Sequence, residues 1–298
     1  MHAPVILFVY NRIEHTQKTI EALKAVDQAD QISLIIYSDG PTSDQADKQK
    51  VEQVRSYLRL LQRDHPFSTT ALNEREENLG LARSVISGVS EVLARWDSVI
   101  VLEDDIVVSV PFYEIMNQLL NEYKEDSRVN SISGYMYPVA IPRESSDFFL
   151  MKRASSWGWA TWRDRWEQVD WAVSDYDEFM SSKDFQRRFN EGGEDLTPML
   201  IKWKKGKNDS WAIRWCYHQC RMHTYGIFPK NSMVVNIGND GTGTHSRSTS
   251  RYQQQLNDSY QITLPKTITE DAIISGNIEQ FFRLSPIRRF INKLTLDN

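Results

Sequence analysis

The chain has 298 residues, of which 40% are hydrophobic and 11% aromatic, and its formal net charge at pH 7 is −5. This length can bury one large core or two ordinary ones. The acidic balance argues against nucleic acid as the main partner, because neutralising phosphates needs a basic surface. The apolar run at the amino terminus is too short to span a membrane and lacks the layout of a signal peptide. The only cysteines, Cys216 and Cys220, fit a reduced compartment, so we expect a cytoplasmic protein.

From residue 4 to residue 102 the sequence alternates predicted strands with predicted helices. Short apolar, β-branched runs predict strands over residues 4–10, 32–38, 67–73 and 98–102, and apolar residues at helical spacing predict helices over residues 16–26, 43–62 and 79–96. Ser43 is the expected N-cap of the second helix. The third helix should bury Leu81, Val85, Val89 and Val92 on one face. Such a series predicts an α/β fold, with a mainly parallel sheet flanked by helices.

Polar residues follow three of the four predicted strands. They are Asn11 and Arg12, then Ser38, Asp39 and Gly40, and then the acidic triplet Glu103, Asp104 and Asp105. Ligands of open α/β sheets bind at the carboxyl ends of the strands. Carboxylates grouped there suit Mg²⁺ or Mn²⁺ held together with substrate phosphates, and such an ion would neutralise a departing nucleoside diphosphate. The alternative is that these acids are solvated loop residues, and for Asp39 an ordinary turn is the favoured interpretation.

Several segments resemble glycosyltransferases. PVILFVYNR, YSDGP, NLGLARSV and VIVLEDDIVVS, in that order, resemble the nucleotide-sugar half of a GT-A glycosyltransferase, and the EDD form of the D-x-D motif resembles the N-acetylglucosaminyltransferase I family. SSWGWATWRDRW (155–166) and the stretch 208–245 resemble bacterial family-2-type enzymes of surface-polysaccharide clusters. The resemblance implies a Rossmann-like GT-A domain over residues 1–247, with a nucleotide-sugar half (1–108), an acceptor half (109–247) and a short C-terminal extension (248–298).

The activity implied by the resemblance is metal-dependent, inverting sugar transfer. The donor would be a nucleotide sugar, with UDP as the expected nucleotide, and the acceptor a saccharide or lipid-linked saccharide in surface-polysaccharide synthesis. Asp105 would bind Mn²⁺ or Mg²⁺, Asp104 would face the ribose, Glu103 would lie near the donor sugar, and Asp39 would bind the uracil or ribose side. The other implied donor-binding residues are Val9, Tyr10, Asn11, Arg12, Asn78 and Arg83. For Asn78, a helix cap is an equal alternative.

Inverting transfer also needs a general base for the acceptor hydroxyl. Asp209 is followed by a predicted helix and then by YGIFP, which is the order of base, helix and closing strand in the family. Asn208, however, stands where the family has a second acid. Asp195 and Glu194 are the alternatives for this role, and N-capping of the following helix is the alternative role for Asp209.

Two tryptophans are candidates for stacking on acceptor sugars, Trp157 first and Trp211 next, while most of the nine should be core residues. Trp159, Trp162 and Trp166 have helical spacing. The glycine-rich stretch 236–245 ends in His245, a second candidate for a metal or phosphate contact. Residues 190–198 and 237–250 are candidate lids over the donor, and the second is favoured.

Two other functions remain open at this point. A sugar nucleotidyltransferase would normally carry a glycine-rich, basic loop after the first strand, and VYNRIEHT has no glycine. A non-catalytic carbohydrate-binding protein would be expected to lose the three acids, which are all present. The last segment, residues 285–298, is basic and amphipathic. It suits an anionic membrane, a dimer contact or packing on the domain, and we expect packing. The sequence does not set the oligomeric state.

Overall fold

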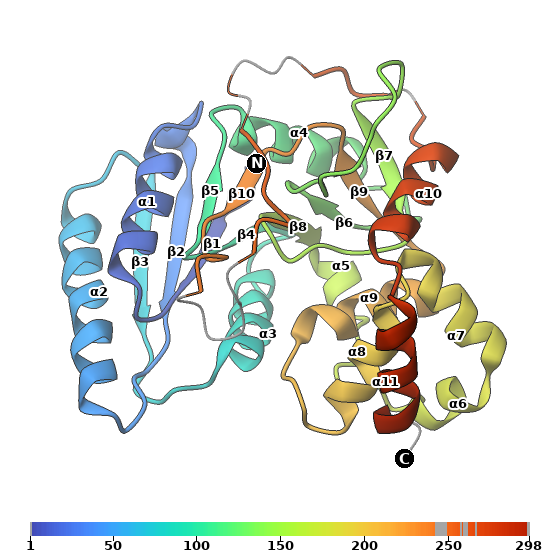
Figure 1. Ribbon diagram of the computed structural model, residues 1–298. Coiled ribbons are helices and arrows are strands. Elements are labelled where there is room, and N and C mark those ends of the chain that lie inside the picture. Colours follow the sequence, from blue (N-terminus) through green and yellow to red (C-terminus); the bar gives the residue numbers. More distant parts are fainter. Residues whose placement is uncertain (1, 242–248, 257, 259–261, 266, 297–298) are drawn as a thin grey trace.

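A mixed eight-stranded sheet lies between two layers of helices in the computed structural model, which describes residues 2–241, 249–256, 258, 262–265 and 267–296 (Figure 1). The strand order is β3-β2-β1-β4-β8-β6-β9-β7. These strands are β1 (Val5–Val9), β2 (Ser33–Ser38), β3 (Thr69–Glu74), β4 (Ser98–Glu103), β6 (Val129–Ser133), β7 (Phe148–Met151), β8 (Trp159–Trp162) and β9 (Tyr225–Pro229). A second, two-stranded sheet pairs β5 (Ile106–Val108) with β10 (Val234–Asn236).

Helices connect these strands, and two further helices follow the last strand in the described part of the chain. They are α1 (Ile13–Lys24), α2 (Gln45–Arg63), α3 (Leu81–Leu93), α4 (Phe112–Glu122), α5 (Arg163–Trp166), α6 (Tyr176–Ser181), α7 (Lys183–Phe189), α8 (Leu196–Lys204), α9 (Trp211–Arg221), α10 (Ala272–Phe281) and α11 (Pro286–Leu296), with 3₁₀ turns η1 (Ala29–Gln31) and η2 (Asn190–Gly192). None of the described helices is long and apolar enough to cross a membrane.

The first four strands of the sheet are all parallel, since β1 pairs with β2 and β4, and β2 pairs with β3. The remaining half is mixed, because β8 runs antiparallel to both β4 and β6. The expected α/β fold, with a mainly parallel sheet flanked by helices, is confirmed. The chain moves outward from β1 to β2 and β3, and then returns to the other side of β1 as β4. The strand order therefore reverses between β1 and β4, which is where open α/β sheets form a ligand-binding crevice.

Both faces of the sheet are buried, as the alternation along β1 shows. Val5, Leu7 and Val9 pack into a core with α1, α2 and α4, whereas Ile6 and Phe8 pack into a second core with α3 and α9. A central parallel strand covered on both faces has no polar side, which explains its continuous apolar run.

Four details differ from the sequence expectations. The N-cap of α2 is Asp44, whose side chain accepts a hydrogen bond from the Ala46 amide, and not Ser43. Leu81, the first residue of α3, is exposed. The segment from Trp159 to Trp162 is a strand, although its tryptophans are in the core as expected. Helix α10 was not predicted, yet it buries Ile274 and Ile278 against the main core.

Candidate functional site

The acidic triplet lies at the carboxyl end of β4, where Glu103 is the last residue of the strand and Asp104 and Asp105 follow it. Arg12 lies shortly after the end of the neighbouring strand β1. Arg12 Nη2 lies 2.7 Å from Asp105 Oδ2, and it also forms an ion pair with Asp104. The parallel pairing of Phe8 with Glu103 brings these two strand ends together. One guanidinium from β1 thus bridges two carboxylates from β4 across the reversal point of the sheet.

The triplet carries more negative charge than Arg12 neutralises. Burial, followed by the charges of Asp105 and Asp104, raises the pKa of Glu103 well above its usual range. Burial also raises the pKa of Asp104 to about 6, against the opposing effect of Arg12. In addition, Arg12 Nη1 is buried and has no hydrogen-bond partner among the described residues. The site can therefore accept a further cation beside the carboxylates and an anion beside Arg12.

The chemistry of these donors fits a divalent cation. Carboxylate oxygens are hard ligands, and Mg²⁺ is usually held by one or two carboxylates together with substrate phosphates. Within the described ranges no three His, Cys, Asp or Glu side chains are placed to hold a metal ion by themselves. The residues present thus suit an ion that the protein and a phosphorylated ligand would hold together. His245, the other proposed metal contact, lies outside the described residues.

The start of the glycine-rich stretch covers the triplet. The Ile237 amide donates to the backbone oxygen of Asp105 over 2.9 Å, and Asn236 Nδ2 lies 3.5 Å from Asp105 Oδ1. A Cβ atom on Gly238 would stand only 2.0 Å from Asp105 Oδ2. Nε2 of His15, on α1, lies 3.2 Å from Asp240 Oδ2. The glycines mark this stretch in the sequence, but the pairing of β10 with β5 is what brings it to Asp105.

Asp39 organises the turn before α3. Its carboxylate accepts hydrogen bonds from the amides of Gly40 (3.1 Å), Leu79 (3.0 Å) and Gly80 (2.9 Å). A carboxylate has about four acceptor positions, so these three bonds leave little capacity for a nucleotide. Asn78 does not cap the helix, because Gly80 occupies that position. The side-chain Nδ2 of Asn78 instead donates a hydrogen bond to the Gly40 carbonyl. Arg83 is exposed in the first turn of α3.

A residue that sequence analysis missed fixes the end of β1. Asp47 of α2 accepts hydrogen bonds from the Tyr10 hydroxyl, from Asn11 Nδ2 (2.7 Å) and from the Thr42 amide (2.7 Å). Although partial burial opposes it, these hydrogen bonds lower the pKa of Asp47 to about 2. No local pattern marks this role, because Asp47 lies 36 residues from Asn11. Val9 is a core residue, so only its backbone is left for the expected contact with the nucleotide.

Asp209 lies near the turn that Asp39 holds. A Cβ atom on Gly80 would be 4.0 Å from Asp209 Oδ2, and Asp209 is exposed. It is not the N-cap of α9, since the Ser210 hydroxyl accepts the Ile213 amide. The carboxylate is therefore left without the capping role that was its main alternative.

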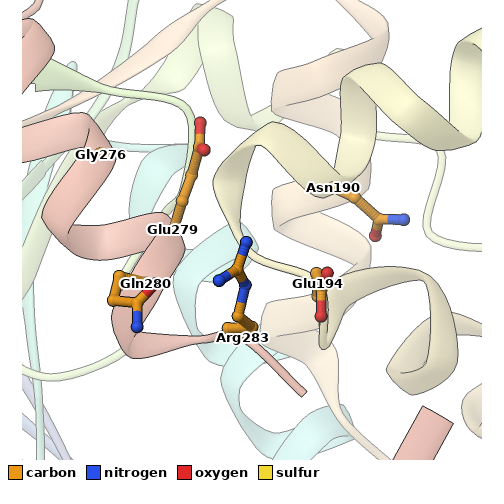
Figure 2. A pocket seen from close by; sticks show the side chains of 6 residues that line it. All are labelled: Asn190, Glu194, Gly276, Glu279, Gln280 and Arg283. Atoms are coloured by element: carbon orange, nitrogen blue, oxygen red, sulfur yellow. The ribbon is translucent and has the colours of Figure 1, made fainter. Parts of the chain in front are cut away.

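Asp195 and Glu194 are engaged in structural contacts. Asp195 forms a bidentate pair with the buried Arg153, at 2.9 Å for each oxygen. Glu194 lines a pocket of about 290 Å³ between η2 and α10, and Figure 2 shows it facing this space together with Arg283. Glu194 also accepts the Leu284 amide and pairs with Arg289. These contacts favour Asp209 over both alternatives.

Replacing Asp195 tests this distinction. Asp195→Asn should destabilise the protein by about 3 kcal/mol, because Arg153 keeps its charge while losing its partner in a buried position. Urea unfolding measures this change. Asp184→Asn, which breaks an exposed pair with Arg187, is the matched control and should change stability little. An Asp195→Asn protein of normal stability without activity would instead return the catalytic role to Asp195.

The two acceptor candidates have different environments. Trp211 is only 3% exposed and packs against Trp159 and Trp166, so the expectation that it stacks on a sugar is wrong. Trp157 is partly exposed and contacts the rings of Tyr135 and Tyr252. The antiparallel pairing of β4 with β8 ends at Val101 and Trp159, so Trp157 lies beyond the end of β8 on the side where the triplet follows β4.

Neither the known protein families nor the curated proteins contain a match to this chain. Among solved structures, TarS of S. aureus has a TM-score of 0.38 and 13% identity over 57% of this chain and 30% of that chain. The mannosyltransferase PcManGT from Pyrobaculum calidifontis, in complex with GDP-Man and Mn²⁺, has a TM-score of 0.37 and 14% identity over 57% and 47%. A cytidylyltransferase from Leptospira borgpetersenii has a TM-score of 0.35 and 10% identity over 58% and 65%.

This chain therefore spans less than two thirds of the length of each of these three proteins. Because one fold can host unrelated activities, similarities of this size leave the function to be argued from the residues of the site.

Proposed function

We propose that the protein is a metal-dependent, inverting glycosyltransferase of the GT-A type. It would move a sugar from a nucleotide donor, with UDP as the expected nucleotide, to a saccharide or lipid-linked saccharide acceptor in surface-polysaccharide synthesis. The observation that carries the proposal is the juxtaposition of the acidic triplet and Arg12 at the reversal point of the sheet. That position binds ligands in open α/β sheets, and its chemistry suits a diphosphate with a divalent cation.

In this proposal each residue of the site has a separate task. Asp105 is the metal ligand, and Asp104 and Glu103 face the ribose and the donor sugar. The buried, unpartnered Nη1 of Arg12 is available for a phosphate oxygen. A bound Mn²⁺ or Mg²⁺ would supply positive charge against the departing nucleoside diphosphate. Asp209 would accept the proton of the acceptor hydroxyl as that oxygen attacks the anomeric carbon.

The remaining donor contacts are also proposals. Asp47 holds Tyr10 and Asn11 in place, so these two side chains would orient the nucleotide from a rigid strand end. Asp39 would act mainly by shaping the turn that carries Asn78 and Gly80. The exposed Arg83 lies in the first helical turn of α3, which directly follows the loop that carries Asn78 and Gly80.

The acceptor would lie against Trp157. A cavity of about 950 Å³ is lined by residues from segments 137–141, 230–232 and 250–256. Tyr252, which contacts Trp157, precedes the lining residue Gln253 in the chain but does not itself line the cavity. Carboxamides such as those of Asn231 and Gln253 line it. Such a cavity is large enough for a small-molecule ligand, and we propose that it receives further sugars of the acceptor.

Trp157→Ala tests the acceptor side. Removal of a partly exposed stacking surface should raise the acceptor KM by about tenfold and leave nucleotide affinity unchanged. Trp211→Ala is the contrasting variant, which should destabilise the fold by about 3–5 kcal/mol because it empties a core position. A Trp157→Ala protein with unchanged acceptor KM would remove Trp157 from the site.

Gly238→Ala tests the loop over the triplet. The new methyl group would overlap Asp105 Oδ2 and approach Arg12 Nη1 to 2.8 Å, so the loop or the ion pair must move. We expect nucleotide affinity to fall by about tenfold or more, a loss of ~1.4 kcal/mol. Gly276→Ala is the control, because a Cβ atom there meets nothing within 4 Å. Titration calorimetry with UDP and Mn²⁺ measures both, and equal affinities would contradict the proposed contact.

Thermal shifts with a panel of nucleotide sugars, with and without Mn²⁺, test the donor part of the proposal. A ligand at 100 times its Kd stabilises by about 2.7 kcal/mol, which raises Tm by about 5 °C for a chain of this size. One nucleotide class should give this shift in the presence of the metal and lose it with chelator. No shift from any nucleotide sugar would contradict the proposal.

A further inference from the structure

Helix α11 is docked on the protein by its polar side. Arg289 Nη2 pairs with Glu194 Oε1 over 2.6 Å, and Asn292, one turn further, is only 8% exposed. Ile287, Phe290 and Ile291 lie at the i, i+3 and i+4 positions and therefore share another face, and they are 73%, 63% and 41% exposed. An amphipathic helix that packs on its own domain has the opposite arrangement. Helix α11 thus packs on the domain as expected, but the face formed by Ile287, Phe290 and Ile291 is not the face that packs.

The exposed apolar face is unusual within the described part of the chain. Four other large hydrophobic residues are exposed there, and they are dispersed over the structure: Leu60, Leu81, Met222 and Ile273. Isolated exposed apolar residues are ordinary, whereas several on one face indicate a surface that another phase or molecule covers.

Basic side chains lie on α11 and on the neighbouring segment that contains α8. Helix α11 packs against α8, and Figure 1 shows the two side by side at the edge of the molecule, near the carboxyl terminus. Burial, together with the charges of Arg288 and Lys207, lowers the pKa of Lys202, so these cations lie close to one another. Glu194, which contacts α11, is paired with Arg289. Lys202, Lys207 and Arg288 thus form a basic cluster where α8 and α11 meet, on a chain whose formal net charge is −5.

We propose that α11 lies in the interface of an anionic lipid bilayer. Ile287 and Phe290 would enter the boundary between headgroups and acyl chains, and Arg288, Lys202 and Lys207 would face the lipid phosphates. A second copy of the chain fits less well, because a two-fold contact through this face would place like charges opposite each other. The inference is independent of the proposed function. If both hold, the membrane contact would bring the enzyme to a lipid-linked acceptor.

Vesicle co-sedimentation of the full-length protein, without nucleotide, tests this inference. The protein should sediment with vesicles of phosphatidylglycerol and phosphatidylcholine and remain in solution with phosphatidylcholine alone. The double variant Ile287→Ser/Phe290→Ser should bind the anionic vesicles at least about tenfold more weakly. Arg288→Ser and Lys207→Ser should each weaken binding by about fivefold, and high salt should weaken binding of the wild-type protein.

Leu60→Ser is the matched control, since Leu60 is as exposed as Phe290 but lies on α2, and its vesicle binding should equal that of the wild type. Wild-type protein that ignores anionic vesicles would overturn the inference. So would a double variant that binds them as well as the wild type does. A wild-type dimer in light scattering that the double variant dissociates, without vesicle binding, would assign this face to self-association instead.

Discussion

Asp209→Asn is expected to lower the turnover number by about 10²–10⁴-fold, the usual contribution of a general base. The amide keeps the shape of the side chain but cannot accept the proton of the acceptor hydroxyl. Nucleotide affinity should remain close to that of the wild type, because Asp209 lies by the Gly80 turn and makes no contact with Asp105 or Arg12 among the described hydrogen bonds and ion pairs. Steady-state kinetics with saturating donor measure the effect.

Ser210→Ala is the control for this prediction. It removes the N-cap of α9 next to Asp209 and should cost about 1 kcal/mol of stability, with turnover retained. If Asp209→Asn turned over at the wild-type rate, the proposed base would be wrong. If Ser210→Ala lost as much turnover as Asp209→Asn, a displaced α9 would explain both results, and Asp209 would not be assigned as the base.

Asp105→Ala is expected to abolish the stabilisation that UDP and Mn²⁺ give together. Asp105 is the proposed metal ligand, and the variant leaves Arg12 paired with Asp104 alone. The ligand-free protein should keep its Tm or gain slightly, because the substitution removes one of three carboxylates that repel one another. Differential scanning fluorimetry measures both quantities.

The other end of the same strand supplies the control. Asp97 precedes β4 and pairs with Arg163 at 3.2 Å, with its side chain exposed, so Asp97→Ala should leave the nucleotide-dependent shift unchanged. Stabilisation of Asp105→Ala by UDP and Mn²⁺ at the wild-type level would contradict the metal assignment. Equal stabilisation of the wild type in the presence of chelator would do the same.

The sequence predicts the half of the fold in which local signals and tertiary structure agree. Strands β1 to β4 were placed within two residues of their observed ends. For β1, β2 and β4 the reason is that buried parallel strands are apolar runs, whereas β3 is an edge strand with no buried residue. The later half was harder to predict. Trp159 and Trp162 have helical spacing but form a short strand that is buried on both faces, so spacing does not distinguish the two structures.

The candidate site was predicted where it depends on strand ends and missed where it depends on distant partners. The triplet and Arg12 follow apolar strands, and parallel topology brings such ends together. The role of Asp47 arises because α2 returns to the end of β1, and the hydrogen bonds of Asp39 arise because β2 ends beside the turn before α3. Long-range contacts of this kind leave no pattern in one sequence. Burial of Trp211 is likewise set by two tryptophans from other elements, Trp159 of β8 and Trp166 of α5.

A proton NMR time course with the nucleotide sugar that stabilises the protein, Mn²⁺ and a saccharide acceptor tests the central claim most directly. The wild-type protein should consume the anomeric signal of the donor, release the nucleoside diphosphate and form a glycoside of the opposite anomeric configuration, while Asp209→Asn should leave the donor almost unchanged. A product that retains the donor's configuration would contradict inversion. Release of pyrophosphate from a nucleoside triphosphate and a sugar phosphate, with no glycoside formed, would contradict the glycosyltransferase assignment itself.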